Sequence, residues 1–252
     1  MEKRLVKQSS LLVFLSMICI ASICSIAFIG CTTADVSSTI GSNYIGSNAD
    51  YKIFSDGWDL SVVDTARNVN YLSDVEKDVI LELNKARTNP ARYAELYIAP
   101  RTKKFLGTIY NGTLKTNEGV SAVNECVEVM GKASAVSALT PQEGLSLAAQ
   151  DHAYSQGDTD QVGHIGVDGS NPSERIEKYG TYKTAGENIC YGQVTGQEIV
   201  VQLLIDDGVS NRGHRENILK ADYTSAGCGF ARKHKTYGSV CVTTFAGGYK
   251  EK

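Results

Sequence analysis

The spacing of apolar residues predicts several helices in the C-terminal part of the chain. From Val75 to Ala86, apolar side chains recur at intervals of three and four residues, which is the period of one buried helix face. Ser73 and Glu76 fit a capping box at the start of this helix, and Pro90 interrupts the pattern. The same spacing predicts further helices over Val120–Met130, Leu145–Tyr154, Ser173–Tyr179 and Gln197–Leu204.

Three apolar runs have the composition of strands instead. They cover Glu187–Tyr191, Thr224–Ala231 and Tyr237–Phe245. The last two flank a short polar stretch and so predict a hairpin. Because the helices do not alternate strictly with the strands, the order of elements indicates an α+β layered fold with a small antiparallel sheet.

The first thirty residues are predicted to be a signal peptide. A basic start, Lys3 to Lys7, precedes an apolar run from Leu11 to Ile29. Gly30 directly before Cys31 resembles a bacterial lipobox, in which Cys31 becomes the lipidated N-terminus and its acyl chains hold the protein on a membrane. The expected location is therefore extracytoplasmic and lipid-anchored, with simple secretion and a retained membrane anchor as alternatives.

Residues 31–70 are expected to be a tether, and residues 71–252 a single domain. The tether is rich in Ser, Thr, Asn, Asp and Gly, although its Trp58–Val63 stretch is apolar enough to dock on the domain. The remaining length suits one hydrophobic core. The formal net charge of −3 and the lack of a strong basic run argue against a nucleic-acid partner.

Cysteine usage agrees with export. Of seven cysteines, two lie in the signal peptide and Cys31 is assigned to lipid, which leaves an even set: Cys126, Cys190, Cys228 and Cys241. A hairpin that turns between His234 and Lys235 would place Cys228 opposite Cys241, close enough for a disulfide. The alternative is that all four are small buried thiols.

Two histidines and one acid follow glycines, where a side chain can be presented into a cleft: His164, Glu187 and His214. Two neutral imidazoles can share a divalent cation such as Zn²⁺, while a carboxylate ligates the ion or orients a ring. With only two protein ligands such binding would be weak, and it should fall as the pH drops through about 6.5, the ordinary value for histidine. The alternative is that His164 and Glu187 hydrogen-bond each other for purely structural reasons.

The chain resembles the CAP superfamily of cysteine-rich secretory, antigen 5 and pathogenesis-related proteins. The resemblance spans about Leu72 to Tyr249 and rests on the order and spacing of these motifs: Leu83 to Arg87, Leu147 to His152, Gly163-His164, Gly186-Glu187-Asn188, Asp206 to Val209, Gly213-His214-Arg215 and Gly227 to Phe230. It implies an α-β-α sandwich with a cleft of two histidines, His164 and His214, and two acids.

The resemblance identifies the first acid of the cleft clearly and leaves two choices for the second. Glu187 matches the first, and Asp206 stands where the second would be, with Asp207 as the alternative. Leu203 occupies the place of a tryptophan that many members have three positions before that acid. Arg215, next to His214, is expected to pair with an acid such as Asp207.

Three classes of function remain, and the chain is interpreted as a binding protein rather than an enzyme. The first is a module whose cleft takes a divalent cation together with a lipid-like, small-molecule or protein ligand. The second is a hydrolase in which a histidine and a carboxylate activate water. The third is a structural or adhesion domain with a vestigial cleft. Apolar walls would favour a lipid-like ligand, whereas a serine beside either histidine, Ser210 being nearest to His214 in sequence, would favour hydrolysis.

Overall fold

The computed structural model describes residues 54–252, with side-chain environments from residue 56 onward. These residues belong to the second of two compact units, Gly41–Lys252. The expected signal peptide, the lipidated Cys31 and the tether up to residue 53 lie outside the described residues. All features below belong to the second unit.

The centre of this unit is a four-stranded sheet with the order β6-β9-β10-β8. The strands β8 (Thr184–Tyr191), β9 (Ser225–Ala231) and β10 (Val240–Gly247) are antiparallel, and the short β6 (Thr140–Pro141) adds parallel to β9. Because β8 stands at one end of this order, one of its sides has no neighbouring strand among the described residues.

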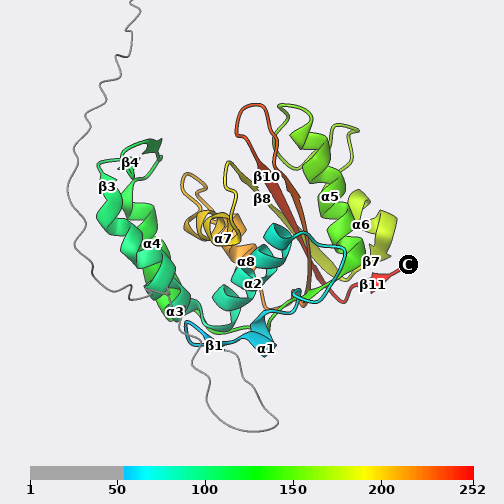
Figure 1. Cartoon of the computed structure of the whole chain (residues 1–252), viewed down its shortest axis with the longest axis horizontal. Helices are drawn as coiled ribbons and strands as arrows, with labels where there is room; N and C mark the ends of the chain where they lie inside the picture. Colours follow the sequence, from blue (N-terminus) through cyan, green and yellow to red (C-terminus); the bar gives the residue numbers. More distant parts are fainter. Residues whose placement is uncertain (1–53) are drawn as a thin grey trace, which may run out of the picture. The chain divides into compact units, whose positions relative to one another are not determined.

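Helices cover both faces of the sheet (Figure 1). On one face lie α5 (Glu143–Gly157) and α6 (Pro172–Tyr179), which pack on apolar residues of β8, β9 and β10. On the other face lie α2 (Asp74–Thr88), α7 (Gly196–Ile205) and α8 (Gly213–Leu219), which share a larger buried cluster with the sheet. The expected α+β sandwich of three layers is confirmed.

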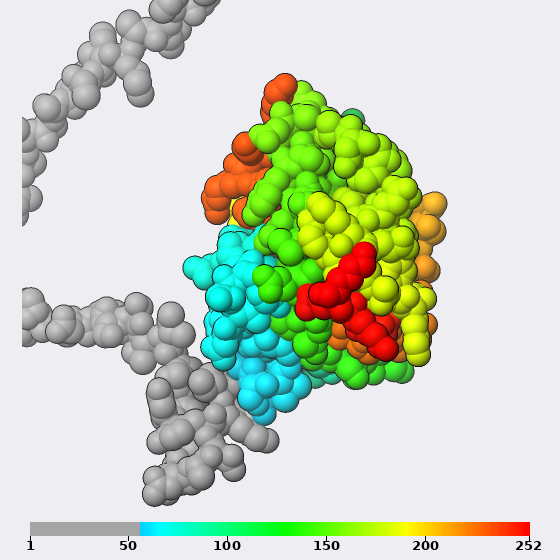
Figure 2. Space-filling model, turned by 90° about the vertical axis from the view of Figure 1, so that its right-hand side faces the viewer, coloured from blue at the N-terminus to red at the C-terminus, as the bar shows by residue number. Residues whose placement is uncertain are grey.

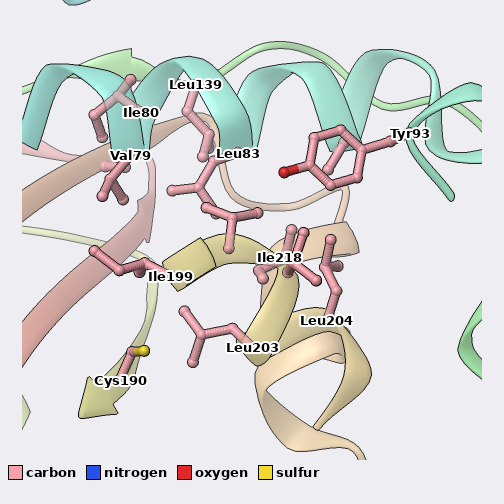
Figure 3. Packing of buried hydrophobic residues seen from close by; sticks show 14 of the residues in the cluster. Val79, Ile80, Leu83, Tyr93, Leu139, Cys190, Ile199, Leu203, Leu204 and Ile218 are labelled. Carbon is pink, nitrogen blue, oxygen red and sulfur yellow. The ribbon is translucent and has the colours of Figure 1, made fainter. Parts of the chain in front are cut away.

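Helix α2 forms as its sequence predicts, and its buried face makes the larger core. The capping box is present, with Glu76 accepting a hydrogen bond from the Ser73 N–H at 2.7 Å. Glu76 is itself buried and also accepts from the Phe230 N–H on β9, so the cap fastens the helix to the sheet. Leu83 points from α2 toward α7, where Ile199 and Leu203 meet it (Figure 3).

Residues 90–132 form a helical arm together with a small three-stranded sheet, here called the β3–β5 hairpin. The elements are α3 (Pro90–Tyr93), the π-helix η1 (Ala94–Ile98), the 3-10 helix η2 (Ala99–Lys104), β3 (Phe105–Leu106), β4 (Ile109–Tyr110), β5 (Leu114–Lys115) and α4 (Val120–Lys132). The three strands form their own sheet. Of these elements the sequence predicts only α4, because the strands have two residues each and show no periodicity.

The ends of the described segment also pack on the domain. β1 (Phe54–Ser55), β2 (Trp58–Asp59) and α1 (Leu60–Val63) lead into the domain, and Trp58, Val63 and Ala66 belong to the larger buried cluster. At the other end β11 (Lys250–Glu251) pairs with β7 (Gly180–Thr181), directly after α6. Figure 2 shows this C-terminal segment, in red, on the surface beside the yellow-green segment that contains α6. The packed chain therefore begins no later than Trp58.

The predicted register of the C-terminal hairpin is wrong by two residues. Thr243, not Cys241, lies opposite Cys228, and Cys241 lies opposite Phe230. Cys228 and Cys241 are therefore diagonal neighbours, with sulfurs 3.7 Å apart and not bonded. All four cysteines of the described residues are buried free thiols, and burial raises the thiol pKa of Cys228 well above its ordinary value.

The register shifts because the residue expected at the tip is buried. His234 is only 4 % exposed and packs against the rings of Tyr191 and Tyr237. The chain turns after this anchor, with the Gly238 N–H donating to the His234 carbonyl at 2.7 Å. Between residues 54 and 252, no helix has both the length and the apolar character needed to cross a membrane.

Candidate functional site

Two histidine–carboxylate pairs stand near strand β8. In the first pair, His164 lies in the loop between α5 and α6, and its Nδ1 is 2.8 Å from Oε1 of Glu187 on β8. The side chain of His164 is 48 % exposed, whereas that of Glu187 is 1 % exposed. A buried carboxylate thus holds an exposed imidazole by one of its two nitrogens.

Arg175 on α6 compensates the buried charge of Glu187. Its Nη2 donates to Glu187 Oε2 at 2.8 Å and to the His164 carbonyl at 3.0 Å, and its Nη1 donates to the Ser170 carbonyl at 2.8 Å. One guanidinium therefore fixes both the carboxylate and the loop that carries the histidine. A buried carboxylate needs such a partner, because removing an ion from water costs several kcal/mol.

His152 hydrogen-bonds the loop that carries His164. It is almost fully buried on α5, and its Nε2 lies 2.9 Å from the Gly163 carbonyl, one residue before His164. Burial lowers the pKa of the His152 imidazole, against the opposing effect of the nearby Glu187 charge. His152 is therefore a packed histidine with a local partner, as its helical position predicts.

The second pair joins His214 to Asp206. His214 lies in the first turn of α8, and its Nδ1 is 2.6 Å from Asp206 Oδ1, while its backbone N–H donates to Asp206 Oδ2 at 2.9 Å. Asp206 follows α7 directly with φ +56°, the left-handed region that aspartate tolerates better than most residues. Its side chain is 2 % exposed, so this carboxylate is also buried.

The loop between the members of the second pair is fastened to the start of α4. Asp207 accepts from the backbone N–H groups of Asn117 at 2.6 Å and Glu118 at 2.8 Å. Glu118 accepts in turn from the Gly208 N–H and from both Nη atoms of Arg212. The Arg212 guanidinium and that N–H lower the pKa of Glu118 to about 2. Asp207 is therefore an anchor of the loop, and Asp206 is the acid that contacts His214.

Arg215 does not pair with Asp207. Its guanidinium contacts Glu125 on α4 and donates to the Leu204 carbonyl at 3.2 Å. The buried Arg215 therefore ties α8 to α4 and α7.

Amide side chains connect the two pairs across β8. Asn188 donates to the His214 carbonyl at 2.9 Å, and Asn217 donates to Asn188 Oδ1 at 2.9 Å. Successive residues of a strand point to opposite faces, so Glu187 reaches the α6 side and Asn188 reaches the α8 side. The two pairs consequently approach the free edge of β8 from opposite faces of the sheet.

A largely apolar cavity of about 530 Å³, here called the edge cavity, opens beside the second pair. His214 and Asp206 lie in its wall, together with Ile189 and Tyr191 of β8. The remaining apolar wall comes from the β3–β5 hairpin and from α7, through Phe105, Tyr110, Leu114, Val201 and Leu203. His164 is not among the lining residues. The structure therefore brings each histidine to its own acid, but only the second pair borders this cavity.

The chemistry available is that of two oriented imidazoles. When Nδ1 donates its proton to a carboxylate, a neutral ring presents the lone pair of Nε2, which is the arrangement found behind metal-bound histidines. Within residues 54–252, three or more histidine, cysteine or acidic side chains do not gather into a metal site. In the same part of the chain neither imidazole hydrogen-bonds a serine or cysteine.

Sequence reasoning did not identify three residues that organise the site: Arg175, Asn188 and Asn217. Asn188 is adjacent to Glu187 in the Gly186–Asn188 motif, and Asn217 follows the Gly213–Arg215 motif. Both motifs were recognised, but neither predicts what the asparagine side chain contacts. Arg175 carried no signal, because an arginine on a short polar helix is ordinarily a surface residue.

Comparison with known proteins gives the family. The family model described as CAP, Cysteine-rich secretory protein family, matches residues 82–245. A curated relative, "Uncharacterized protein YkwD" of Bacillus subtilis, is 27 % identical over 150 residues, which are 59 % of this chain and 55 % of the relative. The chain thus spans about half the length of that relative.

Two solved structures show weaker likeness. An outer surface protein of Borrelia burgdorferi is 19 % identical with a TM-score of 0.39, covering 45 % of this chain and 80 % of that one. A cysteine-rich secretory protein of Staphylococcus aureus is 18 % identical with a TM-score of 0.34, covering 50 % of this chain and 38 % of that one. These scores are too low to add to the assignment. Since the family model covers well over half of the sequence and includes both histidine–carboxylate pairs, this chain belongs to the CAP, or cysteine-rich secretory protein, family.

Proposed function

We propose that this chain is a binding module of the cell envelope, whose ligand places an extended apolar part in the edge cavity and a polar group at His214. The observation that carries the proposal is the position of the second pair in the wall of a mainly apolar cavity of about 530 Å³. A cavity of this size is typical of sites that enclose small ligands between apolar walls and a few polar groups.

The exposed hairpin supports the proposal. Leu114 is 52 % exposed although it lines the edge cavity. Leu203 occupies the inner wall, where the family resemblance led us to expect a tryptophan, and its smaller side chain leaves more room. An apolar ligand would cover these surfaces and gain about 25 cal/mol for each Å² removed from water.

The same proposal includes a weakly held divalent cation. Each imidazole has its Nδ1 on a carboxylate, which leaves Nε2 as the metal-binding atom, and imidazole nitrogen suits Zn²⁺. With His164 and His214 as the protein ligands, water or the bound ligand would complete the coordination. An ion there would supply positive charge to the polar end of the ligand.

An extracytoplasmic location with a lipid anchor at Cys31 completes the proposal. A Cys31→Ser substitution should move the protein from the membrane fraction to the soluble extracytoplasmic fraction, because the acyl chains would be missing. Retention of the substituted protein on the membrane would instead support an uncleaved N-terminal anchor.

Calorimetric titration of the purified protein with sodium dodecanoate tests the apolar site. Saturable binding should be lost in a Leu114→Arg variant, whose charge enters the edge cavity, and kept in the matched Leu106→Arg variant. Leu106 lies on the same hairpin, is 84 % exposed and does not line the cavity. Equal binding by all three proteins would contradict the proposal.

Titration with Zn²⁺ at pH 7.5 and pH 5.5 tests the cation. We expect one-to-one binding at the higher pH only, because protonated imidazoles cannot bind a metal ion, and loss of binding in the His164→Ala, His214→Ala double variant. The absence of any heat in the folded wild type would contradict the proposed cation site without affecting the proposal for the apolar site.

A further inference from the structure

The free side of β8 is the starting point. Among residues 54–252, β8 pairs with β10 alone, so within this part of the chain no strand hydrogen-bonds the backbone groups on its other side. Such an edge is a template for another extended chain unless the protein covers it.

The register shows which groups of β8 face the free side. Gly192 N–H donates to the Ser239 carbonyl at 3.1 Å, and this contact continues the register in which Tyr191 lies opposite Val240. In an antiparallel ladder the hydrogen-bonded pairs alternate, so Cys190 and Asn188 point their N–H and C=O groups toward β10. Ile189 and Tyr191 therefore point theirs toward the free side.

Side chains cover this edge unevenly. The Ala185 carbonyl accepts from the Tyr223 hydroxyl at 2.9 Å, a short and favourable bond. The Glu187 carbonyl has a long contact of 3.5 Å from Asn217, and the Tyr191 carbonyl has long contacts of 3.5 Å from Gln202 and 4.0 Å from the Cys190 thiol. In the part of the chain that the structure describes, no side chain donates to the Ile189 carbonyl. The cover is thus strong at one end of β8 and weak from Ile189 to Tyr191.

The weakly covered segment coincides with the edge cavity. Ile189 and Tyr191 are the β8 residues that line it, and Gln202 of α7, whose long bond covers Tyr191, lines it as well. A ligand there meets backbone donors and acceptors on one side and apolar side chains of the hairpin and α7 on the other. A hydrocarbon chain packs only against the apolar side chains, whereas an extended polypeptide also hydrogen-bonds the backbone groups.

We infer that the ligand of the edge cavity is an extended peptide segment of another protein that adds to β8 as a fifth strand at Ile189 and Tyr191. This inference rests on the proposed function and specifies its ligand. The backbone of the peptide replaces the long contact from Gln202 to Tyr191, and every second side chain, apolar and best β-branched, faces the wall that contains Leu114 and Val201. Specificity then comes from these alternate side chains, and affinity from the main-chain hydrogen bonds.

A backbone-modified peptide tests strand addition directly. The probe is acetyl-Lys-Val-Thr-Val-Thr-Lys-amide, compared with one twin N-methylated at both valines and another N-methylated at both threonines. The three peptides have identical side chains, and in a strand the valine and threonine amides point to opposite edges. Binding to the purified protein should weaken at least tenfold for one twin and stay unchanged for the other. Equal binding by both twins, or equal loss by both, would overturn the inference.

Hydrogen exchange supplies a second readout with a built-in control. Saturating peptide should slow exchange of the Ile189 and Tyr191 amides at least tenfold, while the Asn188 and Cys190 amides, already bonded to β10, should not change. A bound peptide that leaves Ile189 and Tyr191 unprotected would overturn strand addition. If dodecanoate binds and the peptide does not, the inference fails and the proposed function stands; if neither binds, both fail.

Discussion

The two histidine–carboxylate pairs are alike in chemistry and different in construction. In each, a buried carboxylate receives Nδ1 of a more exposed imidazole, within 2.8 Å for His164 and 2.6 Å for His214. Glu187 belongs to a strand and takes its countercharge from Arg175, which α6 contributes. Asp206 follows a helix and takes its support from the backbone N–H of His214 itself.

The difference shows two ways to satisfy the hydrogen bonds of a buried carboxylate. The first pair depends on long-range packing, because Glu187, Arg175 and His164 come from three separate segments. The second depends on a local loop, because Asp206 and His214 are eight residues apart and Arg212 of their loop forms partly exposed ion pairs with Glu118, just before α4, and with Glu125 on α4. The first pair should therefore be costly to break and the second easier to adjust.

The largest effect is expected from Arg175→Met. The substitution leaves Glu187 with an uncompensated buried charge and frees two backbone carbonyls, so the free energy of unfolding should fall by about 3–5 kcal/mol in denaturant titration. The matched control is Lys178→Met on the same helix, whose ion pair with Asp151 is exposed and should contribute little to stability. Similar losses in the two variants would show that the first pair is not supported by Arg175.

A smaller effect is expected from Asp206→Ala. Alanine loses both hydrogen bonds to His214 and is strained at φ +56°, so unfolding should become easier by about 1–3 kcal/mol. Asp206→Asn keeps a carbonyl acceptor and tolerates this backbone, so its cost should be clearly lower. NMR spectra should show a changed His214 ring and an unchanged His164 ring in both variants. A change at both rings would contradict the independent construction of the pairs.

The smallest effect concerns the pH dependence contributed by His152. Burial, opposed in part by Glu187 and reinforced by Arg175 and His164, lowers the pKa of His152 in the folded state. The unfolded chain therefore takes up this proton at a higher pH than the folded protein does. The contribution of neutral His152 to the free energy of unfolding is present above about pH 6.5 and is lost as the pH falls below it, and that free energy changes by at most about 1.4 kcal/mol per pH unit. A glutamine at position 152 can still donate to Gly163.

The measurement is the free energy of unfolding of wild type and His152→Gln between pH 7.5 and pH 5. The wild type should lose more stability than the variant over this interval, so that the difference between them changes in favour of the variant. Parallel curves for the two proteins would mean that His152 does not titrate differently on folding.

Sequence reasoning succeeded where a signal repeats locally and failed where tertiary packing chose between local options. Helix α2 is an example of success: the run of apolar residues and the Ser73–Glu76 pair specify its face and its start. The C-terminal hairpin is an example of failure, because the polar stretch at 232–235 looked like a tip. Burial of His234 against Tyr191, which is distant in sequence, moved the turn and separated Cys228 from the position opposite Cys241.

The candidate site divides in the same way. The family motifs selected His164, Glu187, Asp206 and His214 as candidate site residues, and the structure places them in two contacting pairs. They did not separate the role of Asp206 from that of Asp207, since both carboxylates precede the same glycine. Only the fold turns Asp206 toward His214 and Asp207 toward the backbone of Asn117 and Glu118.

The sequence by itself indicated the family and a set of candidate site residues, through the motifs that resemble the family, and it indicated the layered α+β class and the main helices through the spacing of apolar residues. The tertiary structure alone decided that Arg175 compensates Glu187, that the cysteines stay unbonded, and that the weakly covered edge of β8 lies in an apolar cavity. These features join segments that are far apart in the chain, and their geometry depends on how helices and strands pack, which no local pattern encodes.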